Sequence, residues 1–124
     1  MIAVDSSTLI AYLQGDRGHD VDAFDTSLIA GDIAVPPVVL TEVLCQPKLP
    51  ESHRTLVLRL PRLELLPDYW VRAVATRSTV LARGLRARLA DTLIAQSCLD
   101  YDISLIARDG DFRHLAKHCG LKLA

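Results

Sequence analysis

The sequence predicts an α/β fold in which a central parallel sheet is covered by helices on both faces. Short apolar runs such as Ile2–Val4 and Ile33–Val35 are typical of strands buried on both sides of a parallel sheet. The longer segments between them have the apolar spacing and the capping residues of helices, and this alternation indicates an α/β architecture. Hydrophobic residues make up 50% of the 124 residues, which excludes a disordered chain and suits one domain over residues 1–124.

Capping residues delimit the first two helices that follow the strand at residues 2–4. Ser6 or Ser7 is expected to cap a helix over Thr8–Leu13, because a seryl oxygen accepts a hydrogen bond from the first turn. A second helix is expected over Val21–Ala30, where Gly31 occupies the position at which glycine commonly ends a helix.

Prolines mark the ends of the expected elements in the middle of the chain, because proline lacks a backbone donor and disfavours continuation of a helix. The elements expected between them are a strand over Ile33–Val35, a helix over Val38–Cys45, a helix over residues 51–60 and a strand over Leu63–Leu66.

The last part of the chain alternates helices with apolar runs that end in turn-forming residues. The expected elements are a long helix from Pro67-Asp68 to about Arg83, a helix over Leu89–Leu99, a strand over Ile103–Ala107, a tight loop Arg108-Asp109-Gly110, a short helix over Asp111–His118 and an edge strand over Leu121–Leu123.

Several protein classes are excluded by composition. No apolar run approaches the roughly 18–20 residues of a membrane span, and the start Met1–Asp5 lacks the basic and long apolar regions of a signal peptide. The 3 cysteines, Cys45, Cys98 and Cys119, lack C-x-x-C spacing. They favour reduced thiols in a cytoplasmic protein over a disulfide framework or a zinc site.

Charge is unevenly distributed along the chain. Residues 1–51 carry eight acidic and two basic side chains (−6), whereas residues 52–124 carry seven acidic and twelve basic ones (+5). Several of the arginines fall between Arg72 and Arg88, and the planar guanidinium group suits phosphate oxygens. On composition alone a solvated helix face is the simpler explanation of these arginines, and a net charge of −1 argues against binding to polyanions by charge alone.

Four acidic positions do not fit a solvated surface. Asp5 follows a buried strand at the carboxyl edge, where ligands of open α/β sheets bind. Glu42 and Asp91 are isolated acids in apolar helical segments, and Asp109, with Asp111 two residues later, follows the strand over residues 103–107. A buried carboxylate needs a cation, an ion pair or a proton.

Each of these acids also has a purely structural explanation. Asp5 is a good N-cap residue, Asp91 suits the first turn of a helix, and Glu42 can pair with an arginine. The sequence Arg-Asp-Gly-Asp is an ordinary turn, in which Asp111 can cap the last helix.

Taken together, the acids indicate a metal site. If the strands that end at Asp5 and Ala107 are neighbours, the carboxylates converge and repel one another unless a cation binds. Oxygen ligands with no comparable histidine favour Mg²⁺ or Mn²⁺, and such an ion can activate water for attack on a phosphodiester.

At these positions the sequence resembles the PIN-domain ribonucleases, and among them the VapC-type toxins of toxin–antitoxin pairs. The matching segments are Val4-Asp5-Ser6-Ser7, Thr41-Glu42, Ala90-Asp91-Thr92-Leu93-Ile94-Ala95 and Arg108-Asp109-Gly110-Asp111-Phe112. Each motif is short, but the ordered set covers residues 1 to about 118.

The resemblance implies a PIN-like three-layer α/β/α fold and a Mg²⁺- or Mn²⁺-dependent endoribonuclease that acts on tRNA, rRNA or mRNA. It also implies a homodimer and a cognate antitoxin that blocks the active site. Carried over, the acidic quartet is Asp5, Glu42, Asp91 and Asp109, with Asp5, Asp91 and Asp109 or Asp111 at the metal and Ser7 as the accessory polar residue. Arg86, Arg88, Arg108 and Arg113 are expected to contact RNA phosphates.

One departure from the family concerns Ala107, where relatives often have Thr or Ser. The tight loop after it also leaves open whether Asp109 or Asp111 is the fourth carboxylate, and the number of metal ions is open too.

Other functions remain as alternatives. The nearest is a catalytically inactive PIN-like module that binds RNA or protein. A receiver-type phosphoacceptor domain needs a lysine at a late strand end, which this chain lacks. His114, His118 and Cys119 suit an ordinary C-terminal helix better than a transition-metal site. Trp70 is expected in the core or a dimer interface in preference to base stacking beside Tyr69, and Tyr12 and Leu13 are candidates to face an antitoxin.

Overall fold

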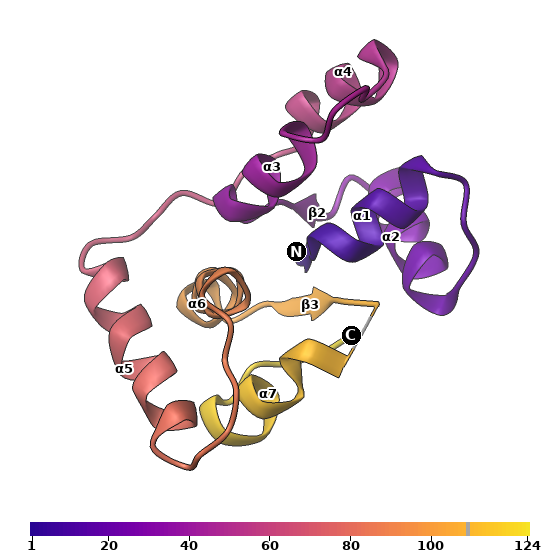
Figure 1. Cartoon of the computed structure of the whole chain (residues 1–124). Helices are drawn as coiled ribbons and strands as arrows, with labels where there is room; N and C mark the ends of the chain where they lie inside the picture. The colour runs from indigo at the N-terminus through magenta and orange to yellow at the C-terminus, as the bar shows by residue number, and fades with distance from the viewer. Residues whose placement is uncertain (109) are drawn as a thin grey trace.

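The computed structural model describes residues 1–108 and 110–124, and its elements alternate as the sequence predicts (Figure 1). In chain order they are β1 (Ile2–Val4), α1 (Ser6–Leu13), α2 (His19–Ile29), β2 (Ile33–Ala34), α3 (Pro37–Leu44), α4 (Glu51–Arg59), α5 (Tyr69–Leu81), α6 (Leu89–Tyr101), β3 (Ser104–Ile106), the 3₁₀ turn Gly110–Phe112 and α7 (Arg113–Cys119).

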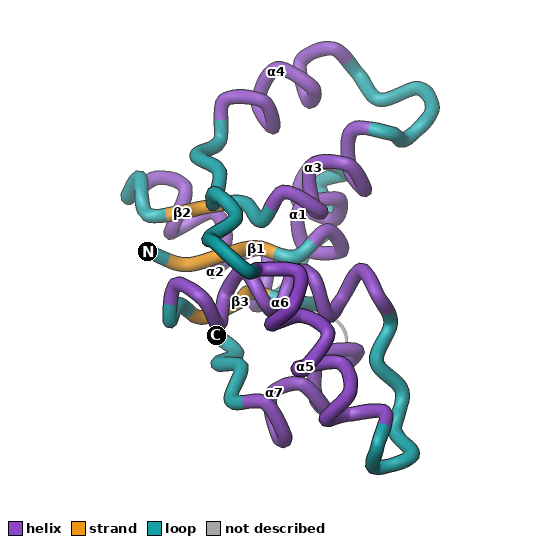
Figure 2. Tube along the Cα trace, turned by 90° about the vertical axis from the view of Figure 1, so that its left-hand side faces the viewer, coloured by secondary structure: helices purple, strands orange, loops and turns teal. Residues whose placement is uncertain are grey.

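The sheet of the described residues has 3 strands in the order β2-β1-β3, and all neighbours run parallel. The strands lie one above another in Figure 2. Ile2 pairs with Ile33 of β2 and with Ser104 of β3, and Val4 pairs with Ile106. The carboxyl ends of β1 and β3 therefore lie side by side, as the predicted convergence of the acids requires.

Helices cover both faces of the sheet. In Figure 1 the sheet lies between α6 on one side and α1 and α2 on the other, and Figure 2 agrees. Helix α5 packs outside α6 and α7. The predicted α/β class with a central parallel sheet and flanking helices is confirmed.

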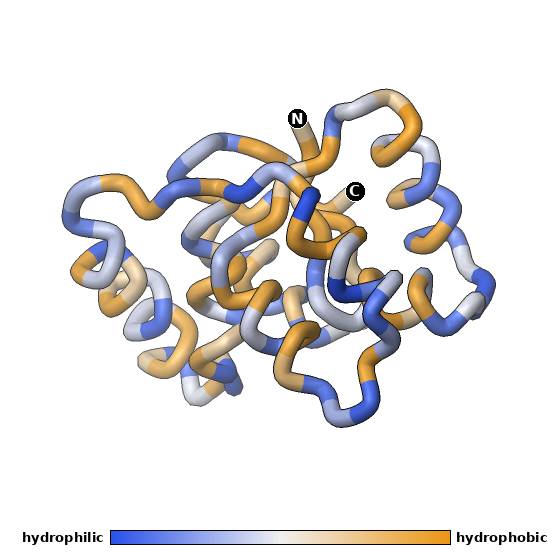
Figure 3. The backbone as a smooth tube through the Cα atoms, turned by 90° about the horizontal axis from the view of Figure 1, so that it is seen from above, coloured by the Kyte–Doolittle hydropathy of each residue, from blue (hydrophilic) through white to orange (hydrophobic). Residues whose placement is uncertain are grey.

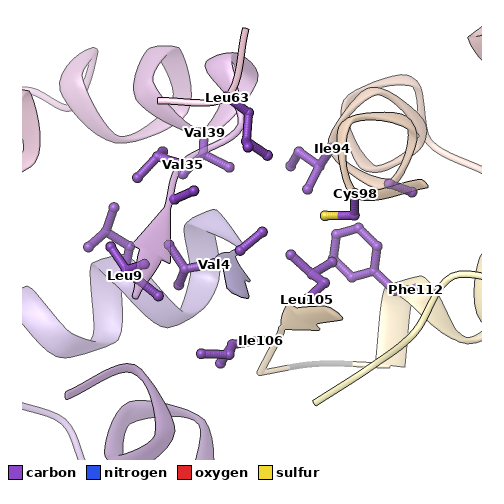
Figure 4. Packing of buried hydrophobic residues seen from close by; sticks show 14 of the residues in the cluster. Val4, Leu9, Val35, Val39, Leu63, Ile94, Cys98, Leu105, Ile106 and Phe112 are labelled. Atoms are coloured by element: carbon purple, nitrogen blue, oxygen red, sulfur yellow. The ribbon is translucent and has the colours of Figure 1, made fainter. Parts of the chain in front are cut away.

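The core fills the space around the strands. Figure 4 shows Val4, Leu105 and Ile106 of the sheet among side chains from the surrounding helices, with Cys98 of α6 beside Phe112. Val4, Leu105, Cys98 and Phe112 are all at 0% exposure. Residues that are distant in sequence thus fix the two strand ends on which the candidate site is built.

Apolar and polar residues alternate along the helices, which is the pattern of helices with one buried face (Figure 3). None of the described helices is long and apolar enough to cross a membrane.

The prediction for the start of the first helix was wrong. Helix α1 begins at Ser6, and Asp5 occupies the N-cap position with φ −82° and ψ 159°. Ser6 and Ser7 lie inside the first turn, where their hydroxyl groups donate to carboxylates instead of accepting from backbone N–H groups.

The predicted strand over Leu63–Leu66 is not formed. Arg62 makes a single bridge, to Val35. The pairing stops there because the next donor along that strand would be Pro37, which has no backbone N–H and begins α3. Leu63 is buried, whereas Leu65 and Leu66 are 42% and 37% exposed. The predicted edge strand over Leu121–Leu123 is reduced to a single parallel bridge between Leu105 and Leu123.

The remaining boundaries differ from the predictions by a few residues at each end. The largest local difference is at the last helix, which is preceded by the 3₁₀ turn and has Phe112 at its N-cap. Asp111 therefore lies in the turn and is not the cap of α7.

Candidate active site

Asp5 is held by the junction between β1 and α1. Its backbone N–H donates to the carbonyl oxygen of Ile106 over 2.9 Å, which ties the ends of β1 and β3 together. The residue is 5% exposed. Within the described part of the chain, its carboxylate makes no capping hydrogen bond to α1. Instead Oδ2 accepts a hydrogen bond of 2.6 Å from Ser7 Oγ, so the structural role of a helix cap does not account for this acid.

Glu42 reaches the same helix turn from α3. Ser6 Oγ donates to Glu42 Oε1 over 2.5 Å, across 36 residues of sequence. Glu42 is half-buried, and among the described residues no arginine forms an ion pair with it. The alternative explanation of Glu42 as the partner of an arginine therefore finds no support, and the first turn of α1 joins two of the predicted acids.

Thr8, in the same turn of α1, binds the carboxylate of Asp20, which the sequence does not predict to belong to the site. Thr8 Oγ1 donates to Asp20 Oδ2 of α2 over 2.9 Å. Arg108 Nε donates to the same oxygen over 3.1 Å. Arg108 Nη2 also donates to the carbonyl oxygen of Arg17 over 2.8 Å. The guanidinium group of Arg108 is therefore engaged by the protein.

Asp91 and Asp111 lie together in a pocket of about 320 Å³. Asp91 is half-buried in the first turn of α6, where the helix dipole favours a negative charge. Arg88 Nη1 lies 3.9 Å from Asp111 Oδ2, an exposed pair that contributes little to stability. The pocket is lined by Arg86, Arg88, Asp91, Gly110, Asp111, Arg113 and His114.

The pocket and the serine-bound acids belong to the same edge of the sheet. Asp5 follows β1, and Gly110 and Asp111 follow the neighbouring β3. Asp91 and Cys98 are seven residues apart and share a face of α6. Burial, and after it the negative charge of Asp5, raise the pKa of the Cys98 thiol to about 12. This face of α6 is therefore turned toward the end of β1.

The donor atoms suit a hard divalent cation. Asp5, Asp91, Asp111 and Ser7 offer only oxygen, which Mg²⁺ and Mn²⁺ prefer over nitrogen or sulfur. Within residues 1–108 and 110–124, no three His, Cys, Asp or Glu side chains form a group that could hold a metal ion. Asp109, the predicted fourth carboxylate, lies outside the described residues.

Two residues at this turn, Ser6 and Asp20, have roles that the sequence does not predict. The sequence predicts Ser6 only as a helix cap, and it does not single out Asp20. The available signal was the run Ser6-Ser7-Thr8 directly after a strand-end aspartate, since three hydroxyl groups in one helix turn exceed the need for a cap.

The aromatic residues singled out from the sequence differ in burial and in their contacts. Tyr69 is buried, and its hydroxyl group donates to the carbonyl oxygen of Leu93 over 2.5 Å. Trp70 is 61% exposed, so it does not belong to the core. Tyr12 packs edge-on against Phe24 with centroids 4.8 Å apart, and its hydroxyl group donates to Asp25.

Comparison with known proteins gives a family and a fold. The family model described as "PIN domain" matches residues 2–118. No curated protein matches the chain in sequence.

Several solved structures have the same fold over nearly the full length of both chains. VapBC2 from Rickettsia felis, bound to a DNA fragment from its promoter, has a TM-score of 0.74 at 18% identity and covers 100% of this chain and 98% of its own. FitAcB from Neisseria gonorrhoeae has a TM-score of 0.73 at 18% identity and covers 99% and 96%. FitAB bound to the IR36 DNA fragment has a TM-score of 0.71 at 19% identity and covers 100% and 94%.

Proposed function

The chain belongs to the PIN domain family, and from that premise we propose that it is a metal-dependent endoribonuclease of the VapC type, a toxin controlled by a cognate antitoxin. PIN domains are typically nucleases and generally depend on a metal ion. The observation that carries the proposal is the placement of Asp5 and Glu42 on one helix turn at the end of β1, together with that of Asp91 and Asp111 in a pocket lined by arginines.

The acids at this edge of the sheet have different proposed roles. Asp5 and Asp91, with Asp109 or Asp111, would hold one or two Mg²⁺ or Mn²⁺ ions. When bound, such an ion lowers the pKa of a coordinated water and stabilises negative charge on a phosphodiester. Ser7 holds Asp5 in place, and Glu42, held by Ser6, orients the attacking water or completes the metal shell.

The arginines of the pocket would position the substrate. Arg86, Arg88 and Arg113 line the pocket beside Asp91, and their guanidinium groups suit phosphate oxygens. Arg108 was also predicted to contact phosphate, but its binding to Asp20 and Arg17 leaves it less available. The proposed substrate class is tRNA, rRNA or mRNA, and the proposed location is the cytoplasm.

A second copy of the chain and an antitoxin are the proposed partners. Large apolar side chains are exposed on the apolar face of α5 and α6, which consists of Trp70, Val74, Leu81 and Leu89 and lines one groove. Contiguous exposed apolar surface commonly marks a protein interface, and we assign it to the homodimer. The groove beside Leu13, between α1 and α3, is the corresponding candidate for the antitoxin.

The test is cleavage of tRNA and total RNA with Mn²⁺ or Mg²⁺ and with EDTA. Asp91→Asn is expected to remove metal-dependent cleavage, since it deletes one ligand charge. Asp102→Asn is the matched control, because Asp102 is an exposed residue at the far end of the same helix and should retain activity. Unchanged cleavage in Asp91→Asn would contradict the assignment. RNA binding without cleavage by the wild type would favour the inactive module.

A further inference from the structure

We propose that Asp20 is a positioning residue for the candidate metal site. It holds Arg108, which lies just after β3, against α1, the helix that follows Asp5. The inference rests on the proposed function, because it assumes that Asp5 takes part in metal binding.

One carboxylate oxygen joins three segments of the chain. Asp20 Oδ2 accepts hydrogen bonds from Thr8 of α1 over 2.9 Å and from Arg108, after β3, over 3.1 Å. Thr8 is fully buried, and the side chain of Asp20 is only 12% exposed. A hydrogen bond between charged partners, such as that from Arg108 to Asp20, is stronger than one between neutral groups.

The backbone before α2 packs closely against the Asp20–Arg108 ion pair. Arg108 has a second anchor in the carbonyl oxygen of Arg17. A Cβ atom at Gly18 would lie 2.5 Å from Asp20 Oδ1 and 3.0 Å from Arg108 Nη2. Gly18 also has φ +155°, which other residues rarely adopt. The turn before α2 therefore depends on glycine to let the backbone approach the ion pair.

The position of the pair in the chain links it to the metal site. Thr8 lies in the same turn as Ser6 and Ser7, which bind Glu42 and Asp5. Arg108 lies two residues after Ile106, whose carbonyl oxygen accepts the hydrogen bond from the Asp5 backbone N–H. The residue between them is Ala107, whose side chain can form no hydrogen bond, so Arg108 supplies the polar side-chain anchor among the described residues that directly follow β3.

The expected consequence is weaker metal binding when the anchor is removed. Residues that orient metal ligands without touching the metal cost about 10–100-fold in affinity when they are replaced. A simple charge effect makes a different prediction: removing the negative Asp20 would weaken binding of a cation, and removing the positive Arg108 would strengthen it. Positioning predicts that both replacements weaken it.

The experiment measures Mn²⁺ affinity without RNA, from the electron paramagnetic resonance signal of free Mn²⁺. Asp20→Asn and Arg108→Gln are each expected to raise the Kd about 10-fold, and the double variant is expected to raise it no further. Asp22→Asn is the matched control, because Asp22 is an exposed acid in the same first turn of α2, and its Kd should equal that of the wild type.

Unfolding temperatures in EDTA separate loss of fold from loss of positioning. If Asp20→Asn does not fold, Arg108→Gln and Gly18→Ala, which crowds the same carboxylate, provide the comparison. An unchanged Kd in the folded variants would overturn the positioning role and leave the proposed function intact. A tighter Kd in Arg108→Gln, or an unchanged Kd with a raised KM for RNA, would overturn it in favour of a charge effect or a phosphate contact. A wild type that binds no Mn²⁺ would overturn both proposals.

Discussion

At the scale of single residues, the first turn of α1 distributes three hydroxyl groups among three carboxylates. Ser6, Ser7 and Thr8 donate to Glu42, Asp5 and Asp20 respectively. Each carboxylate comes from a different segment of the chain, so this turn fixes their relative positions. A buried or half-buried carboxylate that loses its donor is left with an uncompensated desolvation cost.

Ser6→Ala tests the role of this turn. We expect a loss of about 1 kcal/mol in the free energy of unfolding, since a hydrogen bond to a half-buried carboxylate is removed, together with reduced RNA cleavage. Chemical denaturation and a cleavage assay measure the two effects. Ser52→Ala on the exposed side of α4 is the control, and equal cleavage by the two variants would contradict a role for Ser6.

The buried thiol gives a second prediction at this scale. Cys98 is at 0% exposure, and its pKa of about 12 leaves almost no thiolate at pH 8. In a Cys45→Ser/Cys119→Ser variant, the remaining thiol should react with a disulfide reagent only after unfolding in guanidinium. The exposed Cys45, kept as the sole thiol in the matched double variant, should react at once. Rapid reaction of Cys98 in the folded protein would contradict the described packing.

At the residue scale, the sequence was sufficient to single out the acids but not their partners. Asp5 and Asp91 stand out because they follow or interrupt apolar runs. The role of Ser6 depends on Glu42, which is 36 residues away, and no local pattern encodes that distance. A hydroxyl group at a helix start caps or donates according to what tertiary structure brings near it.

At the scale of elements, α5 is fixed to α6 by a polar cluster. Arg72 donates to both carboxylate oxygens of Asp100, over 2.9 and 2.6 Å, and Gln96 donates to the same residue. Thr76 completes the cluster by donating to Gln96. The hydrogen bonds from Arg72, despite the opposing effect of burial, lower the pKa of Asp100.

This cluster predicts a pH dependence of stability. Because the folded pKa of Asp100 lies below the unfolded value of about 3.9, the stabilisation is complete above that value and is lost as pH falls through the folded pKa. Arg72→Ala should lower the free energy of unfolding at pH 7, and the difference from the wild type should shrink below about pH 4. Urea unfolding from pH 7 to 2 measures it, with Arg59→Ala as the control. A difference independent of pH would contradict the assigned ion pair.

Elements were predictable where a local rule governed them. Prolines and glycines set most helix limits within a few residues, and buried apolar runs gave β1 and β3. The expected strand over Leu63–Leu66 is not formed because its partner ends at Pro37, which cannot donate a hydrogen bond and begins α3. That information is not contained in the segment itself.

At the scale of the whole molecule, the order β2-β1-β3 creates the site. The sequence order of the strands does not reveal that the last strand pairs with the first, so the convergence of Asp5 with the residues after β3 was a conditional expectation until the topology was known. The same arrangement leaves α5 on the outside, with its apolar face exposed.

The exposed apolar face of α5 and α6 predicts that the chain forms a dimer. A charged residue introduced into this face should weaken the dimer. Leu81→Lys should shift a dimer toward monomer, measured by sedimentation velocity, because a lysine in the interface must be desolvated. Leu58→Lys is the matched control, since Leu58 on α4 and Leu81 on α5 are both 46% exposed. A monomeric wild type, or equal dissociation by the two variants, would contradict the interface.

The central claim is that Asp91 of α6 and the acids that follow β1 and β3 bind a catalytic divalent ion. The most direct measurement is thermal unfolding of the wild type and of Asp91→Asn in EDTA and across Mn²⁺ and Mg²⁺ titrations. A ligand specific to the folded state stabilises it by roughly 2.7 kcal/mol at a hundredfold excess over Kd. We predict this rise in unfolding temperature for the wild type and its loss in Asp91→Asn. No metal-dependent rise in the wild type, or the same rise in both proteins, would contradict the claim.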